Sequence, residues 1–454
     1  MSLKQPEIET SPKNSVVAPR RLLRMIYPAW MTRDIFLVFS ARFFMSSTRA
    51  LAGIVVPVYF AVLGYRGLTL GLLYTMSAVA SALLTTLIGW ASDRVGRKPF
   101  LVATPLLTSL ACLSFLYFRE ALPLFVFASL GTLGRGAGAG AGMIGPYQPA
   151  EQAFLAQKVS SRDRNTLFGR MGFASSLGAL AGGGPMIALA VLLVSGRTPA
   201  EYHVEFLIGA VFALVSALLA IPLKEPRPAW RRGRGAQASA PRGSARKRAT
   251  RAKLSSFSAR MLMRLWVTNG INGLAVGFFG PLLTYWFYRR FGVGPVQIGA
   301  LYSAINLASL LSNLVSSRVA SRLGLVRAIV MTRVLQAALI IPMVLAPSFW
   351  LAGGIYLLRM MVQRLGLPLR QSFVMGVIPD EERGRVGALS NLPSQVNSAL
   401  APTFAGYLFE HVAMALPFEI GAVLQGLNAT SFYFFFRGIR PPEERPEPPG
   451  PTIE

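Results

Sequence analysis

The chain has few of the residues that give enzymes and secreted proteins their chemistry: one cysteine, two histidines and 19 acidic residues among 454. A single cysteine, Cys112, excludes any disulfide within the chain. No metal-ligand cluster, nucleophile–base pair or phosphate-binding loop is visible, so we expect neither an enzyme nor a need for a metal or cofactor. Charged residues are scarce at 14%, whereas 53% are hydrophobic, a balance typical of a chain that lies mostly in lipid.

Acidic residues are outnumbered by 46 Lys and Arg residues, which leaves a formal net charge of +27. The basic residues cluster in short segments between long apolar runs and are not spread over a soluble domain. This is the pattern of a membrane protein whose basic loops stay in the cytoplasm, so we expect no nucleic-acid partner. The polar, basic N-terminal segment, Met1–Arg24, lacks the apolar core of a signal peptide.

The apolar runs predict an all-α membrane protein, because about 20 mostly apolar residues are enough for a helix to cross a bilayer. Several runs are rich in small or polar residues, which favours helix–helix packing or contact with water over contact with lipid. The twelve predicted spans are Ile35–Gly64, Leu70–Ala91, Phe100–Phe118, Leu122–Ile144, Thr166–Val194, Val204–Leu223, Leu262–Tyr288, Val296–Ser317, Ala328–Ala346, Phe349–Leu369, Val386–Phe409 and Leu416–Phe436.

Loop charge orients the chain. Loops rich in Lys and Arg alternate with loops that have few, so the basic loops and both termini are predicted to be cytoplasmic. The pair Arg289–Arg290 is an exception, on the opposite side. The predicted regions are an N-terminal tail at 1–33, a six-helix bundle at 34–223, a basic linker at 224–260, a second six-helix bundle at 261–438 and a Pro/Glu-rich tail at 439–454.

The linker Lys224–Arg260 combines Pro, Gly, Ser and Ala with many arginines and lysines. We interpret it as a solvated cytoplasmic segment that fixes topology. Anionic lipid head groups are expected to contribute, since each cation near a membrane surface is worth about 1 kcal/mol.

The two bundles repeat one another in sequence, which predicts two pseudo-symmetric halves with a substrate site at their shared midplane. The second copy has lost the acidic residue of the first, because Ser321 stands where the first half has Asp93. The matching pairs are Gly71-Leu-Leu-Tyr74 with Gly299-Ala-Leu-Tyr302, Asp93-Arg-Val-Gly96 with Ser321-Arg-Leu-Gly324, and Pro149-Ala-Glu-Gln152 with Pro368-Leu-Arg-Gln371.

The loop after the second span reads G-x-x-x-D-R-x-G-R-K from Gly89 and resembles the loop 2–3 signature of the major facilitator superfamily of transporters. The resemblance implies twelve transmembrane helices in two bundles that work by alternating access. It also implies that this loop forms a cytoplasmic gate against the start of span eleven, near Arg385–Val386. The alternative is that these charges only enforce topology. The implied gate residues are Gly89, Asp93, Arg94, Gly96 and Arg97.

Arg135 interrupts span four within L-G-R-G-A-G-A-G-A, near mid-membrane. A cation at a helix centre costs roughly 2.5–3.5 kcal/mol, so it should face a wet cavity or a partner. The run resembles the superfamily's span-four motif, which implies a role in proton coupling, while a structural arginine satisfied by backbone carbonyls is an equal alternative. The cluster Gly182–Pro185 in span five resembles an exporter signature, although we prefer tight helix packing or a hinge there.

Polar residues recur at helical spacing in several spans, as expected where helices line a water-filled pathway. Interhelical hydrogen bonds are the competing interpretation. Acidic residues lie only at span edges, so the in-span arginines are expected to lack counter-ions, which favours an anionic substrate. The candidate pathway residues are Arg42, Arg49, Arg135, Asn272, Asn306, Arg359, Gln363, Asn391 and Gln395.

We therefore expect a monomeric, multi-pass transporter of the inner or plasma membrane that exports a small organic compound, in the manner of an efflux antiporter. One alternative is uptake or exchange of a small organic anion held by Arg42, Arg135 and Arg359. An alternative of another class is a non-transporting membrane sensor that signals through the basic linker.

Overall fold

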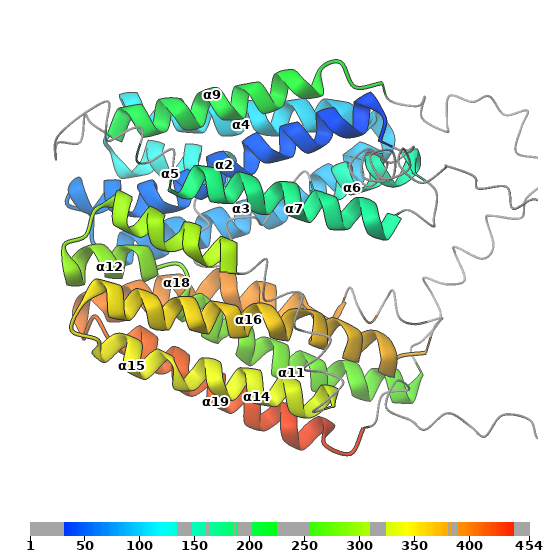
Figure 1. The fold of residues 1–454 in the computed structure, drawn as a ribbon, viewed down its shortest axis with the longest axis vertical. Coiled ribbons are helices and arrows are strands. Elements are labelled where there is room, and N and C mark those ends of the chain that lie inside the picture. The colour runs from blue at the N-terminus through cyan, green and yellow to red at the C-terminus, as the bar shows by residue number, and fades with distance from the viewer. Residues whose placement is uncertain are drawn as a thin grey trace, which may run out of the picture.

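The structure is a computed structural model that describes residues 31–133, 148–159, 164–184, 188, 202–224, 255–308, 324–379, 382, 386 and 389–439. Every regular element in these ranges is a helix, as predicted. The helices form two bundles that lie side by side, blue to green for the first and light green to red for the second (Figure 1).

The first bundle begins at the long helix α2 and ends at α9. Its helices are α2 (Arg33–Val62), α3 (Gly67–Val95), α4 (Lys98–Tyr117), α5 (Ala121–Leu130), α6 (Gln148–Lys158), α7 (Arg164–Gly183) and α9 (His203–Ala220).

The second bundle begins at α11 and includes a helix at 295–308. Its other helices are α11 (Ser256–Phe279), α12 (Leu283–Phe291), α14 (Leu325–Ala338), α15 (Ile340–Leu345), α16 (Phe349–Val377), α18 (Leu392–His411) and α19 (Leu416–Phe436).

The internal repeat is visible in how the helices pack. In the first bundle α2 lies against α7 and α9, and in the second α11 lies against α18 and α19. The repeated glycines Gly96 and Gly324 both have positive φ, 107° and 76°; Gly96 follows α3, two residues before α4, and Gly324 directly precedes α14. A side chain would strain this backbone, so glycine at both positions lets the chain enter the next helix in this conformation.

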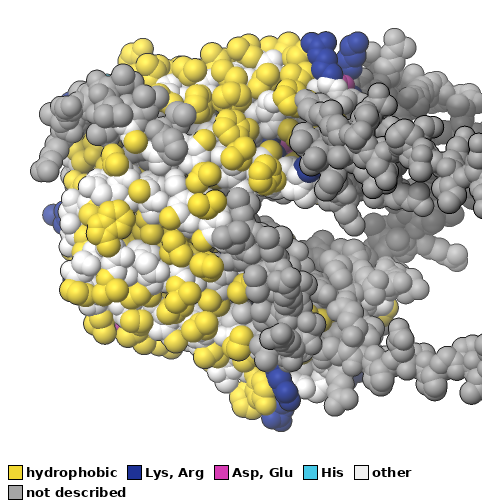
Figure 2. Space-filling model, viewed as in Figure 1, with side chains coloured by type: hydrophobic (Ala, Val, Ile, Leu, Met, Phe, Trp, Pro, Cys, Tyr) yellow, Lys and Arg dark blue, Asp and Glu magenta, His cyan; other side chains and the backbone are white. Residues whose placement is uncertain are grey.

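The outer surface is suited to lipid. Five helical segments are long and apolar enough to cross a membrane: Arg33–Val62, Gly67–Ser92, Lys98–Tyr117, His203–Ala220 and Leu325–Leu345. Large apolar side chains such as Leu83, Leu345 and Val423 are 60–72% exposed. A continuous apolar surface of this kind is unfavourable in contact with water. Hydrophobic side chains cover much of the coloured surface in Figure 2, and several of the visible Lys and Arg side chains lie at its margins.

Two predicted spans are broken, each near a proline. The seventh span divides into α11 and α12 around Pro281, and the ninth divides into α14 and α15 at Leu339. Pro342 cannot donate the hydrogen bond that would continue α14 into α15. The fourth span is described only as α5, which ends at Leu130, since residues 134–147 lie outside the described ranges.

The first bundle contains a buried ion pair that the sequence does not reveal. Arg42 in α2 donates through Nη1 to Oε2 of Glu151 in α6 and through Nε to Ser175 in α7. Both charged side chains are almost fully buried. The expectation that Arg42 lacks a counter-ion is therefore wrong, because α6 packs a carboxylate against α2 from a segment that we had assigned to a cytoplasmic loop.

Replacing Glu151 tests this pair. Glu151→Ala leaves Arg42 buried without a partner and should lower the free energy of unfolding by about 3–5 kcal/mol. Thermal unfolding of the purified protein in detergent measures this. The double change Arg42→Met with Glu151→Met should recover most of the loss, since apolar residues of similar size need no partner.

The exposed pair Arg66–Glu410 provides the control. The Arg66 side chain is 78% exposed, so Arg66→Ala should cost only about 0–1 kcal/mol. Equal losses for Glu151→Ala and Arg66→Ala would contradict a special role for the buried pair.

Candidate functional site

The two bundles meet where α3 crosses α18. Gly67 and Gly71 in α3 face Gly406 and Pro402 in α18. A Cβ atom on Gly71 would lie 2.2 Å from the Pro402 carbonyl oxygen, and one on Gly406 would lie 2.3 Å from the Gly67 oxygen. The two backbones are therefore in direct contact. We call this set of residues the α3–α18 contact.

A second crossing between the bundles lies between α7 and the helix at 295–308. Ser303 Oγ donates to the Leu180 carbonyl at 3.2 Å, and a Cβ on Gly184 would lie 2.7 Å from that Oγ. Gly71 and its counterpart in the repeat, Gly299, thus lie on the two equivalent crossing helices. The repeat read from the sequence corresponds to two related contacts between the halves.

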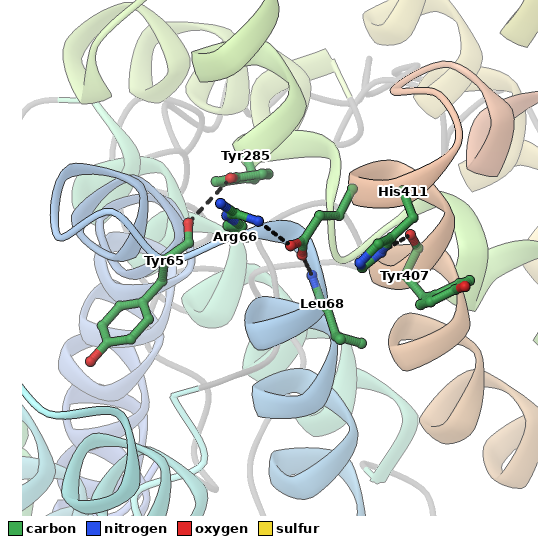
Figure 3. Close-up of polar contacts among 7 residues, drawn as sticks. Tyr65, Arg66, Leu68, Tyr285, Tyr407 and His411 are labelled. Carbon is green, nitrogen blue, oxygen red and sulfur yellow. Dashed lines mark hydrogen bonds and ion pairs between the residues drawn. The ribbon is translucent and has the colours of Figure 1, made fainter.

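Polar groups surround the α3–α18 contact at the first turn of α3 (Figure 3). Glu410, near the end of α18, accepts from Arg66 at 3.3 Å and from the backbone N–H of Leu68 at 3.2 Å. Tyr285 of α12 donates to the Tyr65 carbonyl at 3.3 Å. The N-terminus of a helix carries unpaired N–H groups and partial positive charge, which suits a carboxylate.

Three buried tyrosines lie next to the α3–α18 contact, further along the helices. Tyr302 shares a hydrogen bond of 3.2 Å with Thr284, and its ring centroid lies 6.2 Å from that of Tyr356. Tyr74 of α3 belongs to the same buried hydrophobic cluster as Tyr302 and Tyr356. Within the part of the chain that the structure describes, the buried Tyr74 hydroxyl has no hydrogen-bond partner. Tyr74 and Tyr302 are matching residues of the repeat, so both halves contribute to this layer.

Arginines of α16 lie beside the tyrosines. The Arg359 guanidinium lies 4.0 Å from the centroid of the Phe279 ring, a cation–π contact, and the side chain is 5% exposed. Among the described residues, its buried Nε has no hydrogen-bond acceptor, and the same is true of Nε in Arg364.

Two further arginines of the second bundle are held by amides. Arg333 donates to Asn428 at 2.6 Å, and Asn428 donates to Asn272 at 3.2 Å. Arg370 donates to Asn269 at 3.2 Å and to Asn391 at 3.3 Å. In the part of the chain that the structure describes, neither these two nor Arg359 and Arg364 form an ion pair with a carboxylate. The described arginines of the second bundle thus carry positive charge without a carboxylate, whereas in the first bundle Glu151 neutralises Arg42 and the buried Arg49 donates to a hydroxyl.

The predicted pathway residues fall into three groups. Arg42 and Arg49 are buried in helix–helix contacts, the latter donating to Thr132. Asn391 accepts a hydrogen bond from Arg370, and Asn272 accepts one from Asn428, the partner of Arg333. Arg359 lies beside the Phe279 ring. Asn306 is half-buried in the helix at 295–308, Gln363 is half-buried in α16, and Gln395 is exposed in α18. Arg135 lies outside the described residues.

The predicted gate residues lie at the far end of α3 from the α3–α18 contact. Gly96 ends the helix with its N–H bonded to the Ser92 carbonyl at 3.2 Å, and Arg97 is half-buried. Gly89, Asp93 and Arg94 lie on the backbone of α3, and their side chains fall outside what the structure describes. Their role as a gate stays a prediction.

Several residues of this region were missed from the sequence. Tyr74, Tyr302 and Arg370 had been noted only as part of the repeat, and that repeat is the signal that could have selected them. Glu410 had been noted only as an edge residue, because its partner Arg66 is 344 positions away.

A sequence model of the Major Facilitator Superfamily matches residues 38–264 and 265–453. The chain is 21% identical over 392 residues to multidrug resistance protein MdtG of Proteus mirabilis, covering 84% of this chain and 90% of that protein. It is 22% identical over 410 residues to the MdtG protein of Serratia proteamaculans, covering 87% and 92%.

Solved structures resemble this fold over nearly their whole length. The nucleoside transporter NupG superposes with a TM-score of 0.65 at 14% identity, covering 90% of this chain and 100% of that one. A D-xylose–proton symporter gives a TM-score of 0.66 at 13% identity, covering 90% and 98%. At these identities the likeness concerns the fold.

Adding a side chain at Gly406 should separate the α3–α18 contact. In a Cys112→Ala background carrying Thr75→Cys as a reporter, Gly406→Val should speed labelling by an impermeant thiol reagent at least about tenfold, which corresponds to about 1.4 kcal/mol. The rate of labelling in intact cells is the measurement. Gly426→Val is the control, because nothing lies within 4 Å of a Cβ there. Equal labelling of the two variants would show that the glycine contact does not hold the halves together.

Proposed function

The chain belongs to the Major Facilitator Superfamily, and on this basis we propose that it exports a small organic compound by alternating access. The two MdtG relatives, which are named as multidrug resistance proteins, support an exporter. The proposed setting is the cell membrane, with both termini in the cytoplasm and the protein acting as a monomer. The observation that carries the proposal is the α3–α18 contact, because it brings the two halves together where α3 begins and α18 ends.

Loop charge assigns a side to that end. The loop that holds Tyr65 and Arg66 is one of those with few basic residues, so we place the α3–α18 contact at the outer face. With this assignment the structure is closed outward. The tyrosine layer then lies beneath the closed face, and Arg359 and Arg364 lie deeper toward the cytoplasm.

The proposed gate at the cytoplasmic end uses the same two helices. Helices α3 and α18 are antiparallel, because Gly67 lies against Gly406 and Gly71 against Pro402. At the outer end, the Glu410 carboxylate lies at the N-terminus of α3. We propose that Asp93 makes the equivalent interaction with the N-terminal end of span eleven when the outer end opens. Each helix would thus offer a carboxylate to the start of its partner.

A second candidate function is uptake or exchange of an organic anion. One observation favours it: within the described residues, Arg333, Arg359, Arg364 and Arg370 have no carboxylate partner. Arg42, which the sequence had assigned to such a site, has one in Glu151. An anion site therefore belongs to the second bundle.

Cross-linking the outer end tests alternating access. The hydroxyls of Thr75 and Thr403 lie 2.7 Å apart across the two halves. In a Cys112→Ala background, Thr75→Cys with Thr403→Cys should form a disulfide on oxidation and stop counterflow in proteoliposomes, and reduction should restore it. Each single replacement is a control that should keep transporting under oxidation. Full transport by the cross-linked protein would exclude the rocking mechanism, and inside-out vesicles establish the direction.

Removing the charge at Asp93 separates a transporter from a sensor. Asp93→Asn should weaken closure of the cytoplasmic end and reduce transport at least about tenfold, a loss of about 1.4 kcal/mol. Deleting part of the linker between 230 and 250 should leave transport largely intact. A sensor would show the reverse: Asp93→Asn would keep the activity of the protein, and the linker deletion would abolish it.

A further inference from the structure

We infer that Arg359, Arg364, Tyr302 and Tyr74 bind an organic anion that carries an aromatic ring, and that this anion is the counter-ion that the described residues of the second bundle do not supply. The inference rests on the proposed transport function and names its substrate class.

The charge of the site is the first argument. Arg359 and Arg364 lie five residues apart on α16, and the Arg359 guanidinium lies 4.0 Å from the centroid of the Phe279 ring. Within the described residues, both side chains have a buried Nε without an acceptor. Buried cations in a membrane protein are costly unless an anion, a polar partner or water compensates them. A carboxylate, sulfonate or phosphate group on a ligand supplies both the charge and the acceptors.

The aromatic surroundings are the second argument. The rings of Phe279 and Tyr356 lie 5.9 Å apart, and those of Tyr302 and Tyr356 lie 6.2 Å apart. Flat apolar surfaces next to a guanidinium suit a ligand that has a ring attached to its acidic group. The Tyr74 hydroxyl, buried without a partner, is a donor available to that group.

The position of the site is the third argument. Tyr74 is the eighth residue of α3 and Tyr302 the eighth of the helix that begins at 295, which puts each about 10 Å from the start of its helix. Arg359 is ten residues into α16, or about 15 Å, near the middle of a hydrocarbon core of about 30 Å. The site joins α3 of one half to α16 of the other, so a bound anion connects the parts that must move.

Matched ligands test the chemistry directly on the full-length protein in detergent. The probes are 2-naphthoate, its neutral amide 2-naphthamide, the cation 2-naphthylmethylamine, and the saturated analogue decahydronaphthalene-2-carboxylate. Only 2-naphthoate should raise the unfolding temperature strongly. The saturated acid should bind at least about tenfold more weakly, and the amide and the amine should have no effect. Equal stabilisation by the acid and its amide would overturn the inference.

Variants then locate the bound anion. Arg359→Gln should weaken 2-naphthoate binding at least tenfold, Arg359→Lys should restore part of it, and Tyr302→Phe should have a smaller effect. Arg290→Gln is the matched control: Arg290 also lies near a phenylalanine ring, 5.9 Å from the centroid of Phe291, but is exposed at a helix end. Unchanged affinity in both Arg359→Gln and Arg364→Gln would overturn the assignment.

The unliganded variants give an answer even when binding is lost. If Arg359 waits for an external anion, Arg359→Gln should unfold at the same or a higher temperature than the wild type in the absence of ligand. If Arg359 instead stabilises the fold, Arg359→Gln should lower the unfolding temperature, and 2-naphthoate should not change that temperature. This result would overturn the inference.

Transport assays separate this inference from the proposed function. If 2-naphthoate binds through Arg359 but is not moved across proteoliposomes, the site stands and the transport proposal fails. If only neutral or cationic compounds are exported, and Arg359→Gln does not affect their export, the transport proposal stands and the anion site fails.

Discussion

Direct backbone contact between α3 and α18 is the constraint on which the arrangement of the two halves depends. It is possible only because Gly67, Gly71 and Gly406 have no side chain. Without it, Arg66 would not reach Glu410, and Tyr74 would not approach Tyr302. The contact consists mainly of backbone, small residues and hydroxyls. Apolar side chains of both halves, such as Leu70 and Phe409, belong to one buried cluster beside it.

The halves share a packing scheme but satisfy their buried polar groups differently. The first bundle pairs Arg42 with Glu151. At the position of the repeat that matches Glu151, the second bundle has Arg370, which donates to the side-chain amides of Asn269 and Asn391. An ion pair cancels its own charge, whereas amides only solvate a cation. The second bundle therefore keeps net positive charge in its interior, and this difference between the halves is the basis for placing an anion there.

Local sequence patterns predicted most of the fold, and long-range proximity explains what they missed. Hydropathy located the helices, and the repeat paired Gly96 with Gly324, which both have positive φ. The breaks near Pro281 and Pro342 interrupt spans whose hydropathy is continuous. The site was harder to predict. Arg359 had been selected as an in-span cation, and it lies buried within α16. The partner of Arg42 is 109 positions away, in a segment too polar to be recognised as part of the bundle.

If Arg359 awaits an anion near the middle of the bilayer, as proposed, the protein is also sensitive to voltage. A charge that crosses the whole membrane field gains or loses about 2.3 kcal/mol per 100 mV. The empty site has the full positive charge of Arg359 and Arg364. When an anion is bound, its negative charge lowers the net positive charge of the site. The return step of the empty carrier and the forward step of the loaded one therefore respond differently to the membrane potential, and the cell's electrical state becomes part of the transport cycle.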